Sequence, residues 1–238
     1  MAYPPAASLG SPIEKELARE VNRRLRSGYG HHSWQPRYDP LSELIYTILS
    51  QNTSDVNSHR TFQHLRATFP TWENVMAAPV EEIASAIRIG GLARIKAPRI
   101  NAVLCQIAGE RGSLDLSFLS DMAPAEARAW LRRLPGVGAK TASIVLLFSL
   151  GKPALPVDTH VHRVTRRLGL IGDRDSAERA HDVLEGLLPP EDYYDFHVNI
   201  LTHGRRVCTA RSPRHSECVV SDLCRAYQRF LREGVAVR

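Results

Sequence analysis

The residues best suited to chemistry lie in a short glycine-rich turn and directly after it. The turn Pro135-Gly136-Val137-Gly138 joins two apolar segments, and Lys140 follows in the first turn of the second one. Glycine allows close approach of the backbone, and the free N–H groups that begin a helix can bind phosphate. A plain connection between two helices is the simpler interpretation of the turn alone. Lys140 favours chemistry, because a lysine has little packing reason to begin an apolar helix. Partial burial there would leave some of its amine uncharged and nucleophilic.

The carboxylate of Asp158 is the second candidate for chemistry. It begins Asp-Thr-His after the loop 151–156, and its simplest role is to cap the helix that follows. A carboxylate at a helix start can also stabilise a cation that develops on a substrate and can manage the proton of an amine. Lys140 and Asp158 are therefore candidate catalytic residues.

Three of the four cysteines are clustered near the C-terminus. Cys208, Cys218 and Cys224 fall within 17 residues, and arginines surround them. Four cysteines in a chain of 238 residues do not make a disulfide scaffold, so the cluster indicates a metal site or catalysis. Cys105 lies alone in an apolar helical stretch, and we expect it in the core.

Helical periodicity dominates the segments that must position these residues, and no convincing alternating strand or internal repeat is found. A capping box at 11–14 begins the first helix, and apolar residues four apart, from Ile13 to Leu25, then share one face. Asp55 is expected to cap a later helix. The predicted fold class is all-α.

Composition and charge narrow the functional classes. The hydrophobic fraction of 43% and the charged fraction of 24% exclude a disordered, collagen-like or coiled-coil chain. The longest apolar stretch, 144–150, is far too short to span a membrane, and the N-terminus lacks the pattern of a signal peptide. We therefore expect an intracellular protein.

The net charge of +6 is concentrated near the C-terminus. Residues 201–238 hold eight arginines against three acidic residues. A basic end on an otherwise balanced chain favours a polyanionic partner, although a solvated helix face would give the same pattern.

Taken together, the motifs resemble those of the helix-hairpin-helix DNA glycosylases and, within them, the endonuclease III family. The similarity covers roughly residues 12–230, and the lysine-bearing hairpin with its downstream aspartate is its most specific part. His203-Gly204 also precedes the first clustered cysteine, as in the family. The matching stretches are Leu-Pro-Gly-Val-Gly-Ala-Lys-Thr-Ala at 134–142, Val-Asp-Thr-His-Val-His-Arg-Val at 157–164, Ile-Leu-Ser-Gln-Asn-Thr-Ser-Asp at 48–55 and Gly-Leu-Ala-Arg-Ile-Lys-Ala at 91–97.

The resemblance implies two all-α domains with a DNA-binding cleft between them. Residues 33–152 would form a six-helix barrel that carries the helix-hairpin-helix at about 124–150. Residues 11–32 would join 153–238 in a second helical domain of the iron–sulfur type. Lys140 and Asp158 would then face each other across the cleft, and residues 1–10 would be a disordered tail.

The resemblance also implies an enzyme of base-excision DNA repair. It would remove damaged, oxidised pyrimidines and then cleave the abasic site by β-elimination. One alternative is a mismatch uracil or thymine glycosylase of the same fold. The other is a non-catalytic helix-hairpin-helix DNA-binding protein, and the presence of Lys140 and Asp158 counts against that second alternative. The expected partner is double-stranded DNA with a damaged base or an abasic site. The protein would be a cytoplasmic, nucleoid-associated monomer with no membrane contact.

Several contacts with DNA follow from the same resemblance. Leu92 matches the apolar residue that the family inserts into the duplex. Asn52, with Gln51 beside it, falls where many members have a glutamine that fills the space of the flipped base. The backbone of the hairpin and two arginines of the segment 208–224, called the cysteine segment below, would hold phosphates. These residues are Gly136, Val137, Gly138, Arg211 and Arg214.

The family holds a [4Fe-4S] cluster with four cysteines spaced x6, x2 and x5. Here the pattern reads Cys208-x6-His215-x2-Cys218-x5-Cys224, so a histidine replaces the second cysteine. Three alternatives remain open: a cluster with one histidine ligand, a lost cluster, or a zinc site with three cysteines and one histidine.

Overall fold

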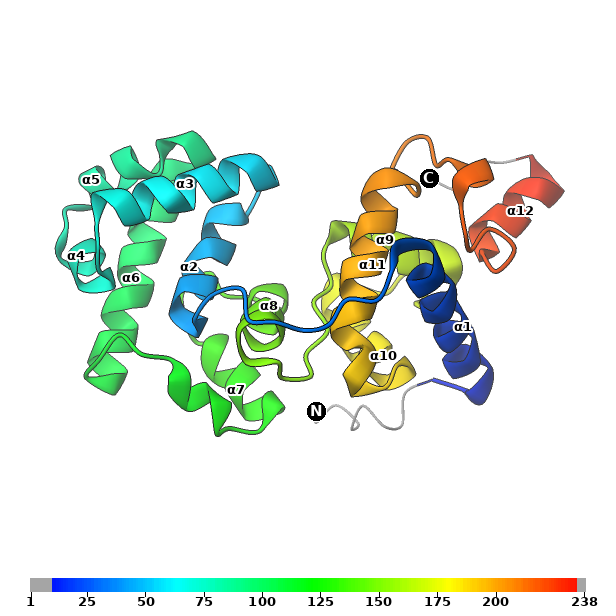
Figure 1. Cartoon of the computed structure of the whole chain (residues 1–238), viewed down its shortest axis with the longest axis horizontal. Helices are drawn as coiled ribbons and strands as arrows, with labels where there is room; N and C mark the ends of the chain where they lie inside the picture. The colour runs from blue at the N-terminus through cyan, green and yellow to red at the C-terminus, as the bar shows by residue number, and fades with distance from the viewer. Residues whose placement is uncertain (1–9, 235–238) are drawn as a thin grey trace. The chain divides into compact units, whose positions relative to one another are not determined.

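The computed structural model describes residues 10–234, and all regular structure in that range is helical (Figure 1). No strand occurs among these residues, so the all-α prediction is confirmed. Apart from Gly10, the predicted tail at 1–10 lies outside the described residues. None of the helices in the described range is long and apolar enough to cross a membrane.

The chain folds into two compact units. The inserted unit comprises Gln35–Lys152, and the terminal unit comprises Met1–Trp34 together with Pro153–Arg238. Segments on both sides of the inserted unit therefore belong to the same terminal unit.

The inserted unit is built around α2, which packs along α8. Eight of the 11 residues of α2 are buried. Even the carboxylate of Glu43 is fully buried there, where it accepts a hydrogen bond from Arg37 Nε at 3.0 Å. The elements of this unit are α2 (Pro40–Ser50), α3 (Asp55–Thr68), α4 (Trp72–Ala77), α5 (Val80–Ala86), η2 (Arg88–Gly90), α6 (Ala93–Arg111), η3 (Ser117–Ser120), α7 (Pro124–Leu131) and α8 (Ala139–Leu150).

The terminal unit is built around α11, which packs against α9 and α1. A buried carboxylate joins two parts of it: Asp195 on α11 accepts from Arg26 Nε at 2.7 Å and from the backbone N–H of His32 at 2.6 Å. The elements are α1 (Pro12–Tyr29), α9 (Thr159–Leu168), α10 (Ala177–Leu187), η4 (Pro190–Asp192), α11 (Tyr193–Arg206), η5 (His215–Glu217) and α12 (Arg225–Glu233).

Local signals at helix starts agree with the structure in part. The capping box of α1 is present, with Ser11 and Glu14 bonded reciprocally. Ile13, however, is 82% exposed, because the buried positions of α1 begin only at Ala18, beyond its first turn. The predicted cap of α3 is wrong by one residue: Ser54 accepts from Asn57 N, and Asp55 is already helical.

The environment of Cys105 also differs from the prediction. Cys105 lies on α6 but is exposed, so the expectation that it packs in the core is wrong. The apolar stretch around it is only partly turned inward, and Val103, Leu104 and Ile107 take the buried positions.

Candidate functional site

The hairpin turn lies between the end of α7 at Leu131 and the start of α8 at Ala139. Gly136 has a φ of +71°, and a Cβ atom there would lie 2.3 Å from Arg99 Nε. This position therefore requires glycine on both conformational and steric grounds. Gly138 precedes α8 and gives it no side-chain cap. The first N–H groups of α8 thus have no side chain competing with an anion for them.

Lys140 lies in the first turn of α8 and is exposed. Its neighbours Ala139, Thr141 and Ala142 are buried, so the helix is fixed in the core while the lysine side chain reaches solvent. The expectation of partial burial for Lys140 is therefore wrong. An exposed amine on a rigidly packed helix is well placed to meet a large substrate such as a polymer.

Gln51 and Asn52 follow α2 and differ in their environments. Gln51 is held at both ends of its amide: its Oε1 accepts from Arg99 Nη1 at 2.9 Å, and its Nε2 donates to Thr141 Oγ1 at 3.5 Å. Asn52 is exposed and has a φ of +54°, which is uncommon for a residue with a side chain. Of the two, Asn52 is the one free to reach a ligand.

Arg99 is a residue of this region that the sequence did not single out. Its side chain lies against Gly136 of the hairpin and donates to Gln51, so it connects the turn before α8 with the loop after α2. The only signal in the sequence was indirect: Gly136 leaves room for a large neighbour.

Leu92 lies between η2 and α6, follows Gly91 and is 48% exposed. Its φ is also +54°, and no other described non-glycine residue except Asn52 has a positive φ. Ile89 and Ile95 beside it are about half exposed as well. Strained backbone conformations concentrate at functional sites, and exposed apolar side chains that lie together mark surfaces that interact with a partner.

Asp158 lies in the terminal unit, whereas Lys140 lies in the inserted unit. The prediction that Asp158 caps a helix is confirmed, since it precedes α9 and accepts from the N–H groups of His160 at 2.8 Å and Val161 at 2.7 Å. Both bonds end on Oδ1. Within the described residues no hydrogen bond ends on Oδ2, which leaves that oxygen for a ligand.

All four predicted metal ligands, Cys208, His215, Cys218 and Cys224, line one cavity of about 100 Å³ in the terminal unit. Cys208 and Cys224 are buried, and Cys218 is half-buried. Burial raises the pKa of Cys218 to about 11 and also raises the pKa of Cys224. Metal binding would displace these protons, because the thiolate is the ligand. Three thiols and one imidazole around one cavity fit an iron–sulfur cluster.

His215 lies on η5, and its ring stacks on Tyr227 at 4.3 Å between centroids. The ring of Phe230 lies nearly parallel at 5.8 Å. These aromatic rings from α12 hold the imidazole on the wall of the cavity. Within 10–234, no group of three or more histidine, cysteine or acidic side chains is close enough to hold a single metal ion.

Two arginines of α9 anchor the cysteine segment. Arg167 is buried, and its Nη1 donates to Cys208 Sγ at 3.3 Å and to Thr209 O at 2.7 Å. Arg163 donates to Cys208 O at 3.1 Å and to Gly204 O at 2.7 Å. Sequence reasoning missed both. The signal was present, since arginines four residues apart share one face of an amphipathic helix.

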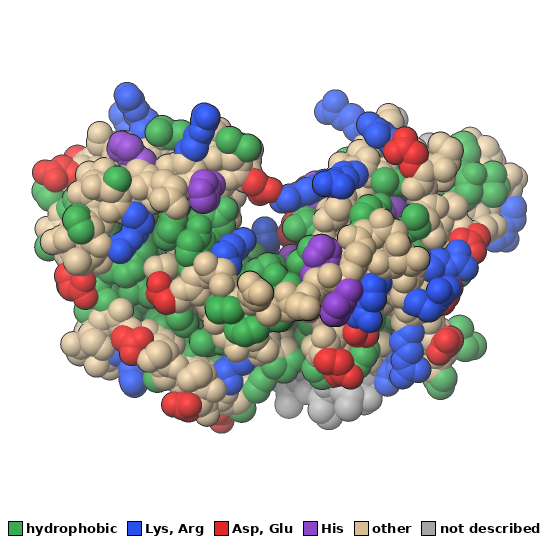
Figure 2. All heavy atoms as spheres, viewed as in Figure 1, with side chains coloured by type: hydrophobic (Ala, Val, Ile, Leu, Met, Phe, Trp, Pro, Cys, Tyr) green, Lys and Arg blue, Asp and Glu red, His purple; other side chains and the backbone are tan. Residues whose placement is uncertain are grey.

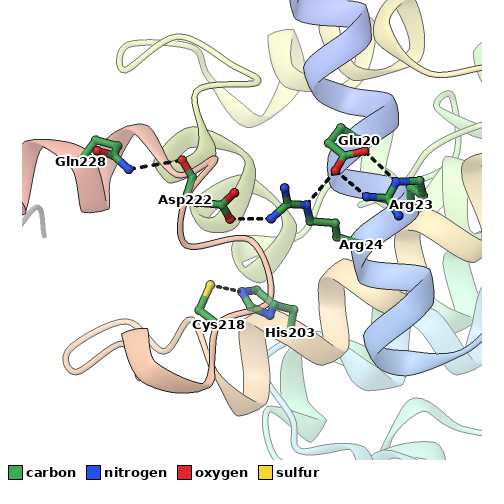
Figure 3. A network of polar contacts seen from close by, with 7 residues as sticks. All are labelled: Glu20, Arg23, Arg24, His203, Cys218, Asp222 and Gln228. Atoms are coloured by element: carbon green, nitrogen blue, oxygen red, sulfur yellow. Dashed lines mark hydrogen bonds and ion pairs between the residues drawn. The ribbon is translucent and has the colours of Figure 1, made fainter.

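The histidine before the cysteine segment also contacts it. His203 is buried, its Nδ1 lies 2.8 Å from Tyr29 Oη, and its Nε2 lies 3.6 Å from Cys218 Sγ (Figure 3). When Cys218 is a thiolate, the tautomer protonated at Nε2 satisfies both contacts, because the ring then accepts from Tyr29 and donates to Cys218. Burial lowers the pKa of His203 to about 4, which keeps the ring neutral. On the same segment, Asp222 accepts from Arg24 of α1 at 2.6 Å (Figure 3).

Arg211 and Arg214 lie on the exposed part of the cysteine segment. Arg214 forms an exposed ion pair with Glu217 at 3.4 Å, and such pairs contribute little. Lysine and arginine side chains (blue) are interspersed with acidic ones (red) on the visible face of each unit (Figure 2).

Two family models match the chain. Residues 45–190 match the HhH-GPD superfamily of base excision DNA repair proteins, and residues 208–224 match the iron–sulfur binding domain of endonuclease III. The first match includes the hairpin, Lys140 and Asp158. The second begins at Cys208 and ends at Cys224, and it includes His215.

Known proteins of the same kind resemble the chain over most of its length. Endonuclease III from Thermotoga maritima is 34% identical over 90% of this chain and 93% of its own. An Arabidopsis thaliana protein named as a DNA glycosylase is 38% identical over 71% of this chain, which spans 57% of that longer relative. A trapped covalent intermediate of an endonuclease III with DNA matches at a TM-score of 0.77, with 30% identity over 92% of this chain and 99% of the other. The chain therefore belongs to the HhH-GPD superfamily of base excision DNA repair proteins, as an endonuclease III-like DNA glycosylase/AP lyase.

Proposed function

We propose that this enzyme removes oxidised pyrimidines from double-stranded DNA and cleaves the resulting abasic site, with Lys140 as the nucleophile. The observation that carries this proposal is the exposed amine of Lys140 on a buried helix, directly after the Gly136–Gly138 turn. The related endonuclease III that was trapped covalently on DNA supports it. A target base inside a duplex is out of reach, so the nucleotide must first be flipped out of the stack.

The proposed chemistry forms and breaks bonds at one sugar. Lys140 Nζ, as free amine, bonds to C1′, and the bond from C1′ to the base breaks, so the base leaves with the electron pair and takes up a proton. The amine then loses a proton, the C1′–O4′ bond breaks as O4′ takes up a proton, and a cationic Schiff base remains. The cationic imine makes the C2′ hydrogens acidic. When a base takes one of them, the 3′ C–O bond breaks by β-elimination and the 3′ phosphate leaves with the electron pair. Water then hydrolyses the imine and releases the enzyme.

We further propose that the carboxylate of Asp158 stabilises the cationic sugar in this reaction. Its Oδ1 is used by the cap of α9, but its Oδ2 is free of hydrogen bonds within the described residues. The two roles can be separated, because asparagine caps a helix as well as aspartate does but carries no charge.

The Asp158→Asn variant is expected to excise the base on the order of 10²-fold more slowly, since it loses a charge that opposes a developing cation. Its stability should change by no more than about 0.5 kcal/mol, because the cap is kept. Single-turnover excision and thermal unfolding measure the two effects. The matched control is Ser176→Ala, which removes the cap of α10 and should lower stability by about 1 kcal/mol without slowing excision. A normal rate for Asp158→Asn would leave Asp158 as a cap only.

The remaining contacts with DNA fall into two kinds. The N-terminal N–H groups of α8 would hold one phosphate, and the exposed Arg211 and Arg214 would hold others, which gives affinity without sequence preference. Asn52 and Leu92 would enter the duplex, Leu92 as an apolar wedge and Asn52 toward the unpaired opposite base. The protein would act on DNA as a monomer.

The damaged base is tested with a panel of duplexes that each carry one lesion: thymine glycol, uracil or thymine opposite guanine, and 8-oxoguanine. We expect excision of thymine glycol to exceed that of the mismatched pyrimidines by at least about 10-fold, and the strand to be cut at the 3′ side of the site. Excision of uracil or thymine without strand cleavage would contradict the proposal and indicate a mismatch glycosylase. Binding without any excision would indicate a DNA-binding protein.

We propose that the cysteine segment holds a [4Fe-4S] cluster through Cys208, His215, Cys218 and Cys224. The four side chains line one cavity, and Arg167 and His203 place N–H groups near two of the sulfurs, as outer partners of cluster ligands commonly do. When bound, the cluster would fix the fold of the segment and so present Arg211 and Arg214 to DNA. The proposed reaction at Lys140 takes place without it.

A further inference from the structure

Lys96 of α6 is the most unusual charged residue of the inserted unit. Its side chain is 2% exposed, among the largest fully buried side chains of the described chain. Lysine is almost never fully buried unless its ammonium group is well paired. Burial lowers the pKa of Lys96, which shows that its environment opposes the charge.

The ammonium group of Lys96 is bonded to three segments at once. It donates to Leu49 O in the last turn of α2 at 2.6 Å, to Thr53 Oγ1 at 2.7 Å and to Gly90 O at the end of η2 at 3.2 Å. All three acceptors are neutral oxygens. The C-terminal end of α2 nevertheless favours a cation, because its last carbonyl groups point toward it.

Thr53 completes the connection between the two loops. Its hydroxyl accepts from Lys96 and donates to Gly90 O at 2.6 Å, so the loop after α2 and the loop before α6 are bonded directly as well as through Lys96. Gly90 is also closely packed, since a Cβ atom there would lie 2.8 Å from Thr61 Oγ1. The two loops cannot shift independently while these bonds are in place.

The two loops fixed in this way are those that carry Asn52 and Leu92. These residues have the same φ of +54°, and they are the two non-glycine residues with positive φ in the described chain. Each lies within two residues of an atom bonded to Lys96: Asn52 precedes Thr53, and Leu92 follows Gly90 by two. Strained conformations of this kind persist only where the surrounding structure holds them, and they concentrate at functional sites.

We propose that Lys96 is a positioning residue that fixes the loops 51–53 and 90–92 relative to each other, so that Asn52 and Leu92 enter the duplex together. This inference rests on the proposed function, in which those two side chains contact DNA. A buried lysine that serves stability alone would need only satisfied hydrogen bonds. Lys96 instead bonds to the two loops with the strained, exposed tips.

The test compares two substrates with one preparation of each variant. The first is a duplex with thymine glycol paired to adenine, which must be unpaired and flipped. The second is the same duplex with a preformed abasic site, in which no base has to be removed from the stack. The measured quantity is the ratio of the single-turnover rate constants for base excision and for strand cleavage. Partial unfolding cancels in this ratio, because it lowers both rates equally.

Lys96→Met keeps the length of the side chain but removes the ammonium group. We expect it to lower the ratio about 10²-fold, since small misplacements of a positioning group have effects of that size. Thr53→Val removes the bridging hydroxyl and leaves Lys96 bonded to the carbonyls. We therefore expect it to lower the same ratio, by about 10-fold. Amide hydrogen exchange should become faster in both loops of each variant.

Lys152→Met is the matched control. Lys152 lies in the same unit, and its Nζ donates to a single carbonyl, Met122 O, at 2.7 Å, away from both loops. Its ratio should equal that of the wild type. An unchanged ratio in Thr53→Val, with wild-type excision intact, would overturn the positioning role even if Lys96→Met did not fold. A wild-type protein that excised no pyrimidine lesion would instead overturn the proposed function.

Discussion

Borohydride should trap the wild-type protein on abasic-site DNA as a stable covalent complex, and should trap none of the Lys140→Gln variant. Hydride adds to the imine carbon and turns the Schiff base into a secondary amine that cannot hydrolyse. Glutamine forms no imine, so the covalent product should disappear, and strand cleavage should fall on the order of 10³-fold or more. Denaturing gel electrophoresis of labelled DNA measures both.

The Lys140→Gln substitution should remove the amine without disturbing the fold. Lys140 is exposed, so its replacement should change the stability by no more than about 0.5 kcal/mol, and affinity for undamaged DNA should be kept. Lys152→Gln, in which the lysine that follows α8 is replaced instead, should be trapped like the wild type. Undiminished trapping of Lys140→Gln would show that another amine is the nucleophile.

Iron content should separate the three possible states of the cysteine segment. Anaerobically purified wild type is expected to carry about four irons per chain and to absorb visible light. His215→Ala removes a ligand, so it should lose most of the iron. His215→Cys should retain iron more firmly and lower the reduction potential of the cluster, because a thiolate adds a negative charge that the imidazole lacks.

Two further variants serve as the positive and the negative control for His215→Ala. Cys224→Ser should lose iron in every case in which the segment binds a cluster, since it removes a buried thiolate ligand. His59→Ala, at an exposed histidine of α3 in the other unit, should keep the wild-type iron content. If wild type carries zinc or no metal, or if His215→Ala keeps its iron, His215 is not a cluster ligand.

The parts of the fold that local rules govern could be predicted from the sequence. Ser11 with Glu14 and Asp158 with its following helix are capping signals, and both form the expected hydrogen bonds. The glycine turn before α8 could also be predicted, because Gly136 is needed for a positive φ. Each of these features depends on residues within a few positions in the chain.

The parts that depend on distant contacts could not be predicted. Cys105 and Ile13 are apolar residues on helices, and whether they are buried depends on which neighbours cover that face. Lys96 was hidden for the opposite reason: a lysine is expected in water, and only the convergence of three carbonyl and hydroxyl oxygens makes its burial possible. Periodicity also cannot show that Lys140 reaches solvent from an apolar helix.

The interrupted layout of the terminal unit determines the order in which the chain can assemble during synthesis. Domains generally fold as units as they leave the ribosome, the N-terminal ones first. The inserted unit is complete at residue 152, when α1 is the one helix of the terminal unit, among the described residues, that has been made. The apolar face of α1, with Val21 and Leu25, must therefore wait for α10 and α11. Metal loading comes later still, because the cysteine segment is translated after both, so the nascent chain completes its lysine-bearing hairpin well before its cluster ligands exist.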